Sequence, residues 1–263
     1  MVAIETLLRQ VVQEFADDNT IALALTGAYI PGQPTTPYSD ADILRYVRIL
    51  PPEDQRQHVR YIGETLLAVT TGSIMAERKK LARPETVVWN VLALRQARSL
   101  YDPDGVFGAL QTEAHHFRWD LEMQRQANLF ASDRLMRLAR TAHQVMGSLM
   151  RRDDAALVGA VEGLTTGLMQ IMTVQRGVLM PRGDAYARTL MRHVGLGSTW
   201  SYYLMQSIGL VENGPRMRGI AALGLYMKTV DLLRPILLSS HAQVVDQTWA
   251  IIAASGYNQD TER

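Results

Sequence analysis

The first part of the chain combines amphipathic helical patterns with short apolar stretches. Apolar residues recur at spacings of three and four over residues 4–15, which places them on one helical face and predicts a helix. Short apolar stretches at 21–25, 41–50 and 66–74, separated by segments containing glycine or proline, predict strands. A further helix is expected to begin at Pro84, because proline suits the first helical turn. This part is therefore predicted to be a mixed sheet packed with helices.

Beyond about residue 106 the helical spacing continues almost alone. Three segments show it most clearly: 121–150, 155–173 and 220–238. We therefore predict an α+β protein of two domains. The first, over residues 1–110, is a small mixed-sheet domain, and the second, over residues 111–263, is an all-α helical bundle.

The composition is typical of a globular protein in a reducing compartment. Hydrophobic residues make up 47% of the 263 positions and charged residues 20%, a balance that supports a buried core. Lys and Arg total 27 against 26 Asp and Glu, so neither a nucleic acid nor an anionic membrane is expected as a partner. The absence of cysteine excludes disulfides, thiolate metal sites and a cysteine nucleophile. With no secretory signal and no apolar run of about 20 residues, a cytoplasmic location is expected.

Two aspartates, Asp40 and Asp42, stand two positions apart at the start of the second predicted strand. Successive side chains of a strand point to opposite faces, so both carboxylates would project to the same face. Two anions held together favour a cation, and Mg²⁺ prefers one or two carboxylates together with phosphate oxygens. The pair predicts a magnesium site, with two ions as in two-metal phosphoryl transfer.

A phosphate-binding surface is predicted beside this pair. Gly27 ends the first predicted strand, where the missing side chain lets backbone amides come close to a phosphate. Ala28 follows it, and Ser39 immediately precedes the aspartates. A nucleoside triphosphate would bind at Gly27, Ala28 and Ser39, with Asp40 and Asp42 as the metal ligands.

These residues resemble the signature of the DNA polymerase beta superfamily of nucleotidyltransferases, in particular the antibiotic and minimal types. That signature reads Gly-Ser-x-Ala-Arg-Gly, then a short loop, then Ser-Asp-x-Asp-Leu, whereas residues 27–32 here read GAYIPG and residues 39–43 read SDADI. Ala28 replaces the serine and Pro31 the arginine. The resemblance implies transfer of a nucleoside monophosphate from an NTP, with ATP as the first candidate, to a hydroxyl of a small acceptor such as an aminoglycoside.

Members of this family usually carry a third carboxylate on a later strand. The third predicted strand has none, but Glu64 precedes it, Glu77 and Glu85 follow it, and Asp102 lies in a turn that backbone geometry already explains. Glu64 is the preferred third catalytic carboxylate. If none of these reaches the metal ions, the general base is missing or is supplied by the helical domain, or the domain binds nucleotide without turnover.

A second catalytic pattern lies in the helical half. Arg188 and His193 are separated by four residues, as in the HEPN ribonucleases that accompany minimal nucleotidyltransferases as toxin and antitoxin, although Thr189 stands where that family prefers Asn, Asp or His. Three hypotheses therefore stay open. They are a nucleotidyltransferase, a nucleotide-binding or interaction protein without catalysis, and a fused toxin and antitoxin.

Overall fold

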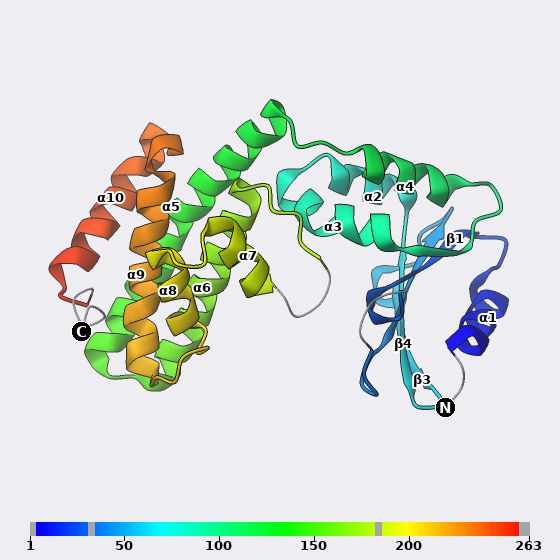
Figure 1. The fold of residues 1–263 in the computed structure, drawn as a ribbon, viewed down its shortest axis with the longest axis horizontal. Helices are drawn as coiled ribbons and strands as arrows, with labels where there is room; N and C mark the ends of the chain where they lie inside the picture. Colours follow the sequence, from blue (N-terminus) through cyan, green and yellow to red (C-terminus); the bar gives the residue numbers. More distant parts are fainter. Residues whose placement is uncertain (1–3, 31–34, 182–185, 258–263) are drawn as a thin grey trace. The chain divides into compact units, whose positions relative to one another are not determined.

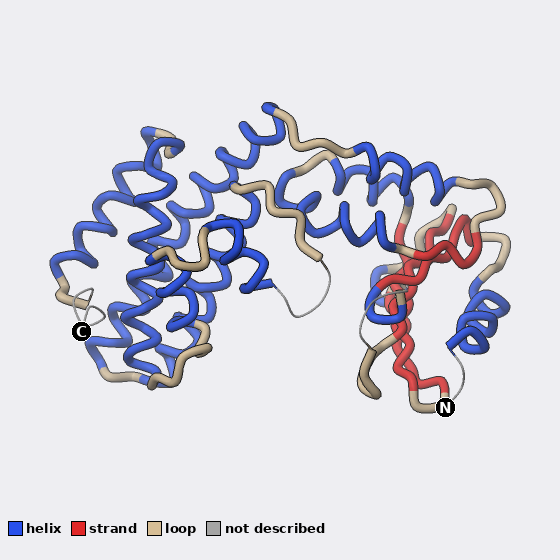
Figure 2. Tube along the Cα trace, in the orientation of Figure 1, coloured by secondary structure: helices blue, strands red, loops and turns tan. Residues whose placement is uncertain are grey.

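The computed structural model describes residues 4–30, 35–181 and 186–257. The chain divides into two compact units. The first comprises Met1–Trp119 with Leu179–Ala185, and the second comprises Asp120–Val178 with Tyr186–Arg263. Strands are found in the first unit, whereas the second is built from helices (Figure 2). The predicted α+β class is therefore confirmed.

The chain first passes from one unit to the other after Trp119, nine residues beyond the predicted boundary at residue 110. Helix α4 (Val106–His116) runs across the predicted boundary without a break. Its buried residues Phe107, Leu110 and Ala114 belong to the core of the first unit. A helix whose apolar face is buried in one unit cannot be divided between two, so α4 belongs to the sheet-containing unit.

A five-stranded mixed sheet organises the first unit. Its strands are β1 (Thr20–Thr26), β2 (Ala41–Val47), β3 (Gln57–Ile62), β4 (Thr65–Gly72) and β5 (Arg98–Tyr101). Their order in the sheet is β3-β4-β2-β1-β5, in which β2 and β4 run parallel and all other neighbours run antiparallel. The three predicted strands correspond to β1, β2 and β4, although β2 ends at Val47 and residue 74 already begins a helix.

Helices cover both faces of this sheet (Figure 1). Besides α4, the unit contains α1 (Ile4–Phe15), η1 (Gly27–Tyr29), η2 (Glu53–Gln55), α2 (Ile74–Leu81) and α3 (Pro84–Gln96). One core joins the apolar face of α1 to Leu23 and Leu25 of β1. The other joins α3 and α4 to Ala22 and Ala24 of the same strand. Alternate residues of β1 thus face opposite layers, as the two-residue period of a strand requires.

Asp17 anchors the connection between α1 and the sheet. Its carboxylate accepts hydrogen bonds from the Thr20 hydroxyl at 2.8 Å and from the Arg45 guanidinium at 2.7 Å. Burial raises the pKa of Asp17, but these hydrogen bonds outweigh it and hold the pKa below its usual value. A carboxylate with a lowered folded pKa stabilises the protein above its unfolded pKa, and this contribution is lost as pH falls through the folded pKa.

Asp17→Asn is therefore expected to destabilise the protein at neutral pH. Because the carboxylate is more than half exposed, the loss should be below about 1 kcal/mol. The difference from wild type should shrink as pH falls below the unfolded pKa of about 4 and on through the lowered folded pKa of Asp17. Urea unfolding from pH 3 to pH 8 measures this, with the exposed neighbour Asp18→Asn as the control. A difference that stays constant over the whole range would contradict the assigned role.

The second unit is a bundle of helices. They are α5 (Leu121–Arg151), α6 (Asp154–Gln175), α7 (Tyr186–Val194), α8 (Thr199–Ser207), α9 (Pro215–Leu233), η3 (Arg234–Ile236) and α10 (Ser239–Ala254). In α6, the most apolar 18-residue window reaches a mean hydropathy of 1.3, which by length and composition would suffice to cross a membrane. Half of that window is buried inside the protein, and α6 packs on α5 and α9. Such burial is typical of a core helix in a bundle.

Helices α8 and α9 pack closely because α9 has a glycine where they meet. The indole nitrogen of Trp200 donates a hydrogen bond of 2.9 Å to the hydroxyl of Thr229 across this contact. A Cβ added to Gly224 would lie 2.6 Å from Cε1 of Tyr203, a ring that is only 7% exposed. This spacing leaves no room for a methyl group.

Gly224→Ala is accordingly expected to destabilise the second unit. Overpacking costs about 1 to 3 kcal/mol, which exceeds the gain of at most about 1 kcal/mol that alanine brings to a helix. Gly159→Ala on α6 is the matched control, because a Cβ there meets nothing within 4 Å and only the helical gain remains. In thermal unfolding, Gly224→Ala should lower the melting temperature and Gly159→Ala should raise it. A stabilised Gly224→Ala protein would show that Tyr203 can move aside.

Candidate functional site

Asp42 lies near the start of β2, in the middle of the sheet. The strand register places it opposite Thr26 of β1 on one side and Ala68 of β4 on the other. Directly opposite residues of neighbouring strands project to the same face, so these three side chains form a row. Thr26 is fully buried, and its hydroxyl donates a hydrogen bond of 3.3 Å to the backbone oxygen of Asp42. Asp42 thus has a fixed place between β1 and β4.

Gly27 and Asp42 come together at the end of β1. Gly27 has a φ of +81°, a left-handed conformation that favours glycine. A Cβ added there would lie 2.7 Å from Oδ2 of Asp42. The carboxylate therefore occupies the space that any other side chain would fill. The glycine and the second aspartate of the motif, which lie fifteen positions apart in the sequence, are in direct proximity.

The other predicted phosphate-binding residues lie in the segments around this point. Ala28 is in the short helical turn η1, which begins with Gly27. The hydroxyl of Tyr29 in the same turn donates a hydrogen bond of 3.4 Å to the backbone oxygen of Ser39. The hydroxyl of Ser39 accepts a hydrogen bond of 2.8 Å from the backbone nitrogen of Thr36. The turn after β1 is thereby tied to the segment that leads into β2.

Asp40 stands one residue before β2 and is half-buried. Pro31 and Gly32, which complete the first half of the motif, lie outside the described residues.

The sheet face that carries Asp42 is accessible beyond β2. On β4, Val69 is buried under α1, whereas its neighbour Ala68 on the opposite face is only partly buried. The same face continues onto β3, where Val59 is 59% exposed and Tyr61 is 70% exposed. Helices α2, α3 and α4 cover this face around Ala22, Ala24 and Tyr46, with Leu44 packed against the same cluster. On β3, the side chains of this face are therefore exposed.

No third carboxylate joins the aspartate pair in the described residues. Glu64, the predicted third member, is exposed in the turn between β3 and β4. The β4 position opposite Asp42 is Ala68. Nowhere in the described ranges do three or more His, Asp or Glu residues gather as a metal site, so Asp40, Asp42 and Glu64 do not form one.

The remaining acidic candidates have structural partners. Glu77 is buried and forms an ion pair of 2.6 Å with Lys80, and Glu85 pairs with Arg83. Asp102 accepts hydrogen bonds of 3.1 Å and 2.9 Å from the backbone nitrogens of residues 107 and 108, which start α4. Its role is to hold the beginning of that helix.

Arg188 and His193 both lie on α7 and are exposed. Five residues along a helix correspond to a rotation of about 140°, so the two side chains do not share a face. The Nδ1 atom of His193 is 3.0 Å from the carbonyl oxygen of Thr189, which occupies one nitrogen of the ring. This contact involves Thr189, and no contact between Arg188 and His193 is found in the described residues.

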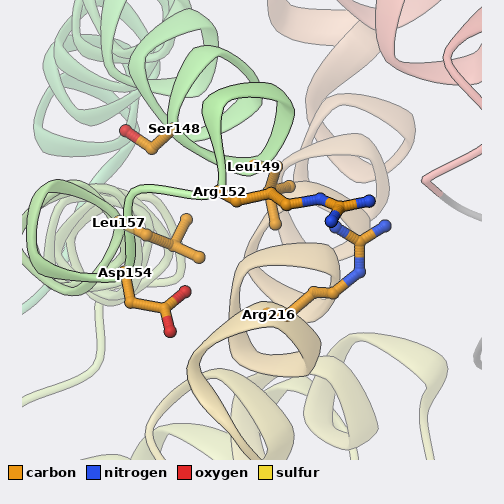
Figure 3. A pocket seen from close by; sticks show the side chains of 6 residues that line it. All are labelled: Ser148, Leu149, Arg152, Asp154, Leu157 and Arg216. Carbon is orange, nitrogen blue, oxygen red and sulfur yellow. The ribbon is translucent and has the colours of Figure 1, made fainter.

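The helical unit has a pocket of about 530 Å³ that sequence reasoning did not identify. Its lining residues are Ser148, Leu149, Arg152, Asp154, Leu157 and Arg216 (Figure 3). They come from the end of α5, the start of α6 and the start of α9. This pocket differs in chemistry from the Asp42 site: it carries two guanidinium groups, whereas the Asp42 site carries paired carboxylates.

Comparison with known proteins supports the fold. No protein-family model matches the sequence, and no curated protein sequence matches it. A solved structure, the nucleotidyltransferase-like protein from Exiguobacterium sibiricum 255-15, is similar over 96% of this chain and 80% of its own, with a TM-score of 0.50 and 12% identity. The protein thus has an α+β nucleotidyltransferase-like fold, with the sheet-containing region followed by a helical region.

Proposed function

We propose that the protein is a Mg²⁺-dependent nucleotidyltransferase that moves a nucleoside monophosphate from an NTP to a hydroxyl of a small acceptor. The observation that carries this proposal is the contact of the left-handed Gly27 turn with the carboxylate of Asp42. A glycine turn without a side chain and an adjacent carboxylate supply the two things that a metal-bound triphosphate needs, a close backbone and an anionic oxygen ligand. The nucleotidyltransferase-like fold supports the same assignment.

The donor set fits magnesium better than a metal held entirely by protein. Asp42 and Asp40 offer hard carboxylate oxygens, and Mg²⁺ is usually bound by one or two carboxylates with phosphates and water completing the shell. When bound, the ions would neutralise phosphate charge and lower the pKa of the attacking hydroxyl. Two aspartates therefore suffice for a site that also uses the substrate's own oxygens.

In the proposed reaction, a hydroxyl oxygen of the acceptor forms a bond to the α-phosphorus of the NTP. The bond from that phosphorus to the bridging oxygen breaks, pyrophosphate leaves, and the hydroxyl proton passes to solvent. The turn at Gly27, Ala28 and Ser39 would orient the triphosphate. The accessible face beyond β2 leaves space for an acceptor, for which an aminoglycoside-like molecule with several hydroxyls is the first candidate.

A nucleotide-binding protein without turnover is the second candidate. Two observations favour it: Ala68 stands opposite Asp42 where a third carboxylate would complete the site, and Ala28 supplies no hydroxyl to the triphosphate. Pyrophosphate release with each of the four NTPs, Mg²⁺ and a panel of hydroxyl acceptors separates the two. Release that depends on one acceptor supports transfer. Stabilisation by Mg²⁺ and nucleotide with no release for any acceptor would support the binding protein instead.

A further inference from the structure

We propose that the pocket of the helical unit is a binding site for a small phosphate-bearing molecule, held by Arg152 and Arg216. All six lining residues belong to the second unit, so the site shares no residue with the Asp42 site. Its volume of about 530 Å³ falls in the range of small-molecule pockets. The base is formed by Leu149 and Leu157, which are 2% and 1% exposed, so it rests on packed core.

The two arginines concentrate positive charge at this pocket. In Figure 3 their side chains run toward one another from α9 and from the end of α5. Within the described ranges of the chain, neither guanidinium forms an ion pair, and Asp154 on the same pocket pairs with neither. Like charges brought together in this way are unfavourable by themselves and are relieved when an anion binds between them.

The backbone at Arg152 gives a second, independent indication. Among the described residues, it is the one non-glycine position with a positive φ, at 55°. The ends of α6, α8 and α10 adopt the same left-handed conformation with Gly177, Gly209 and Gly256. Arginine is disfavoured in this conformation, where glycine is free of strain. Arg152 thus lines the pocket with an unfavourable backbone conformation, and such strain is typical of functional positions.

The remaining contacts hold the second arginine and define the ligand class. The guanidinium carbon of Arg216 lies 5.9 Å from the centre of the Tyr257 ring, a cation–π distance that orients this side chain. Guanidinium groups match phosphate oxygens with paired N–H donors. Two guanidinium groups can donate to three or more oxygens of one phosphate, whereas a simple carboxylate offers only two oxygens. The pair is therefore expected to prefer phosphate to carboxylate.

Titration calorimetry with inorganic phosphate and pyrophosphate tests the proposal at constant ionic strength and without divalent cations, so that the Asp42 site contributes nothing. Wild type should bind both probes, and should bind acetate at least about tenfold more weakly. Arg152→Gly and Arg216→Gln should each weaken phosphate binding by about tenfold or more, since a hydrogen bond to a charged group is lost. Arg140→Gln, an exposed arginine elsewhere on α5, should bind as wild type.

Thermal melts without anion supply a readout that separates binding from structure. Arg152→Gly should melt at or above the wild-type temperature, because glycine removes the left-handed strain. A clearly lower melting temperature would mean that Arg152 serves the fold, and would overturn the proposal. Phosphate affinity unchanged in both pocket variants would overturn it as well, as would equal binding of acetate and phosphate.

Discussion

Asp42→Asn is expected to abolish transfer and Mg²⁺-dependent nucleotide binding while the fold stays intact. Asparagine keeps the shape of the side chain next to Gly27 but removes the charge that a metal ion requires. Loss of preorganised charge at the reacting phosphate typically costs a factor of about 10² to 10³ in rate. Pyrophosphate release should therefore fall by at least about a hundredfold. Asp40→Asn should act in the same direction.

The stability of the same variants distinguishes a metal site from a structural role. Without metal, Asp42→Asn should melt within a few degrees of wild type, because removing one of two neighbouring negative charges does not destabilise the fold. With Mg²⁺ and nucleotide, wild type should gain stability by mass action and the variant should not. Asp54→Asn, an exposed carboxylate in η2, serves as the control. Equal stabilisation of wild type and Asp42→Asn would remove Asp42 from the metal site.

The sequence predicted those elements whose apolar periodicity is strong. Helix α1 has the predicted bounds of residues 4 and 15, and α3 begins at Pro84 as expected. Strand β3 (Gln57–Ile62) was not predicted, because it is an edge strand whose residues are mostly exposed and whose apolar alternation is limited to Val59 and Tyr61. Helix α2 (Ile74–Leu81) was not predicted, and its first residue was placed at the end of a strand, since its charged middle carries little apolar pattern. Both were missed because tertiary contacts, and not local periodicity, stabilise them.

The proximity of Gly27 and Asp42 agrees with the sequence motif, which pairs a glycine turn with an aspartate on the next strand. Sequence reasoning could not supply the neighbour of Asp42 on β4, because β4 is parallel to β2 and is reached only through β3. The strand register identifies that neighbour as Ala68. Glu64 was chosen for its place in the sequence just before β4, yet the same chain reversal leaves it exposed in a turn. Long-range register is set by the whole sheet and not by local residues.

The arginine pocket had no sequence signal of its own. Arg152 and Arg216 are 64 positions apart and belong to different helices. They line one pocket because the end of α5 lies next to the beginning of α9 in the bundle. One local sign was present: Arg152 occupies the left-handed position after α5, where glycine is the usual residue. The helix boundary must be known before that substitution can be recognised, so the structure was needed first.

Gly27→Ala is expected to combine a loss of stability with a loss of nucleotide binding. Alanine at a φ of +81° is strained by about 1 to 2 kcal/mol. Its methyl carbon would also lie 2.7 Å from Oδ2 of Asp42, a contact that only movement of the carboxylate or of the turn can relieve. Overpacking of this kind costs a further 1 to 3 kcal/mol, roughly, in a well-packed region. The displaced carboxylate would no longer support a metal-bound triphosphate.

Gly105→Ala separates the two contributions, because Gly105 has a similar φ of +67° but a Cβ there meets nothing within 4 Å. Both variants carry the backbone strain, so their difference in unfolding free energy isolates the contact with Asp42. We expect Gly27→Ala to be the less stable of the two by about 1 kcal/mol or more. It alone should lose the thermal stabilisation by Mg²⁺ and nucleotide. If both variants are equally stable and both are stabilised by nucleotide, the contact between Gly27 and Asp42 does not hold the site, and the proposed function loses its main support.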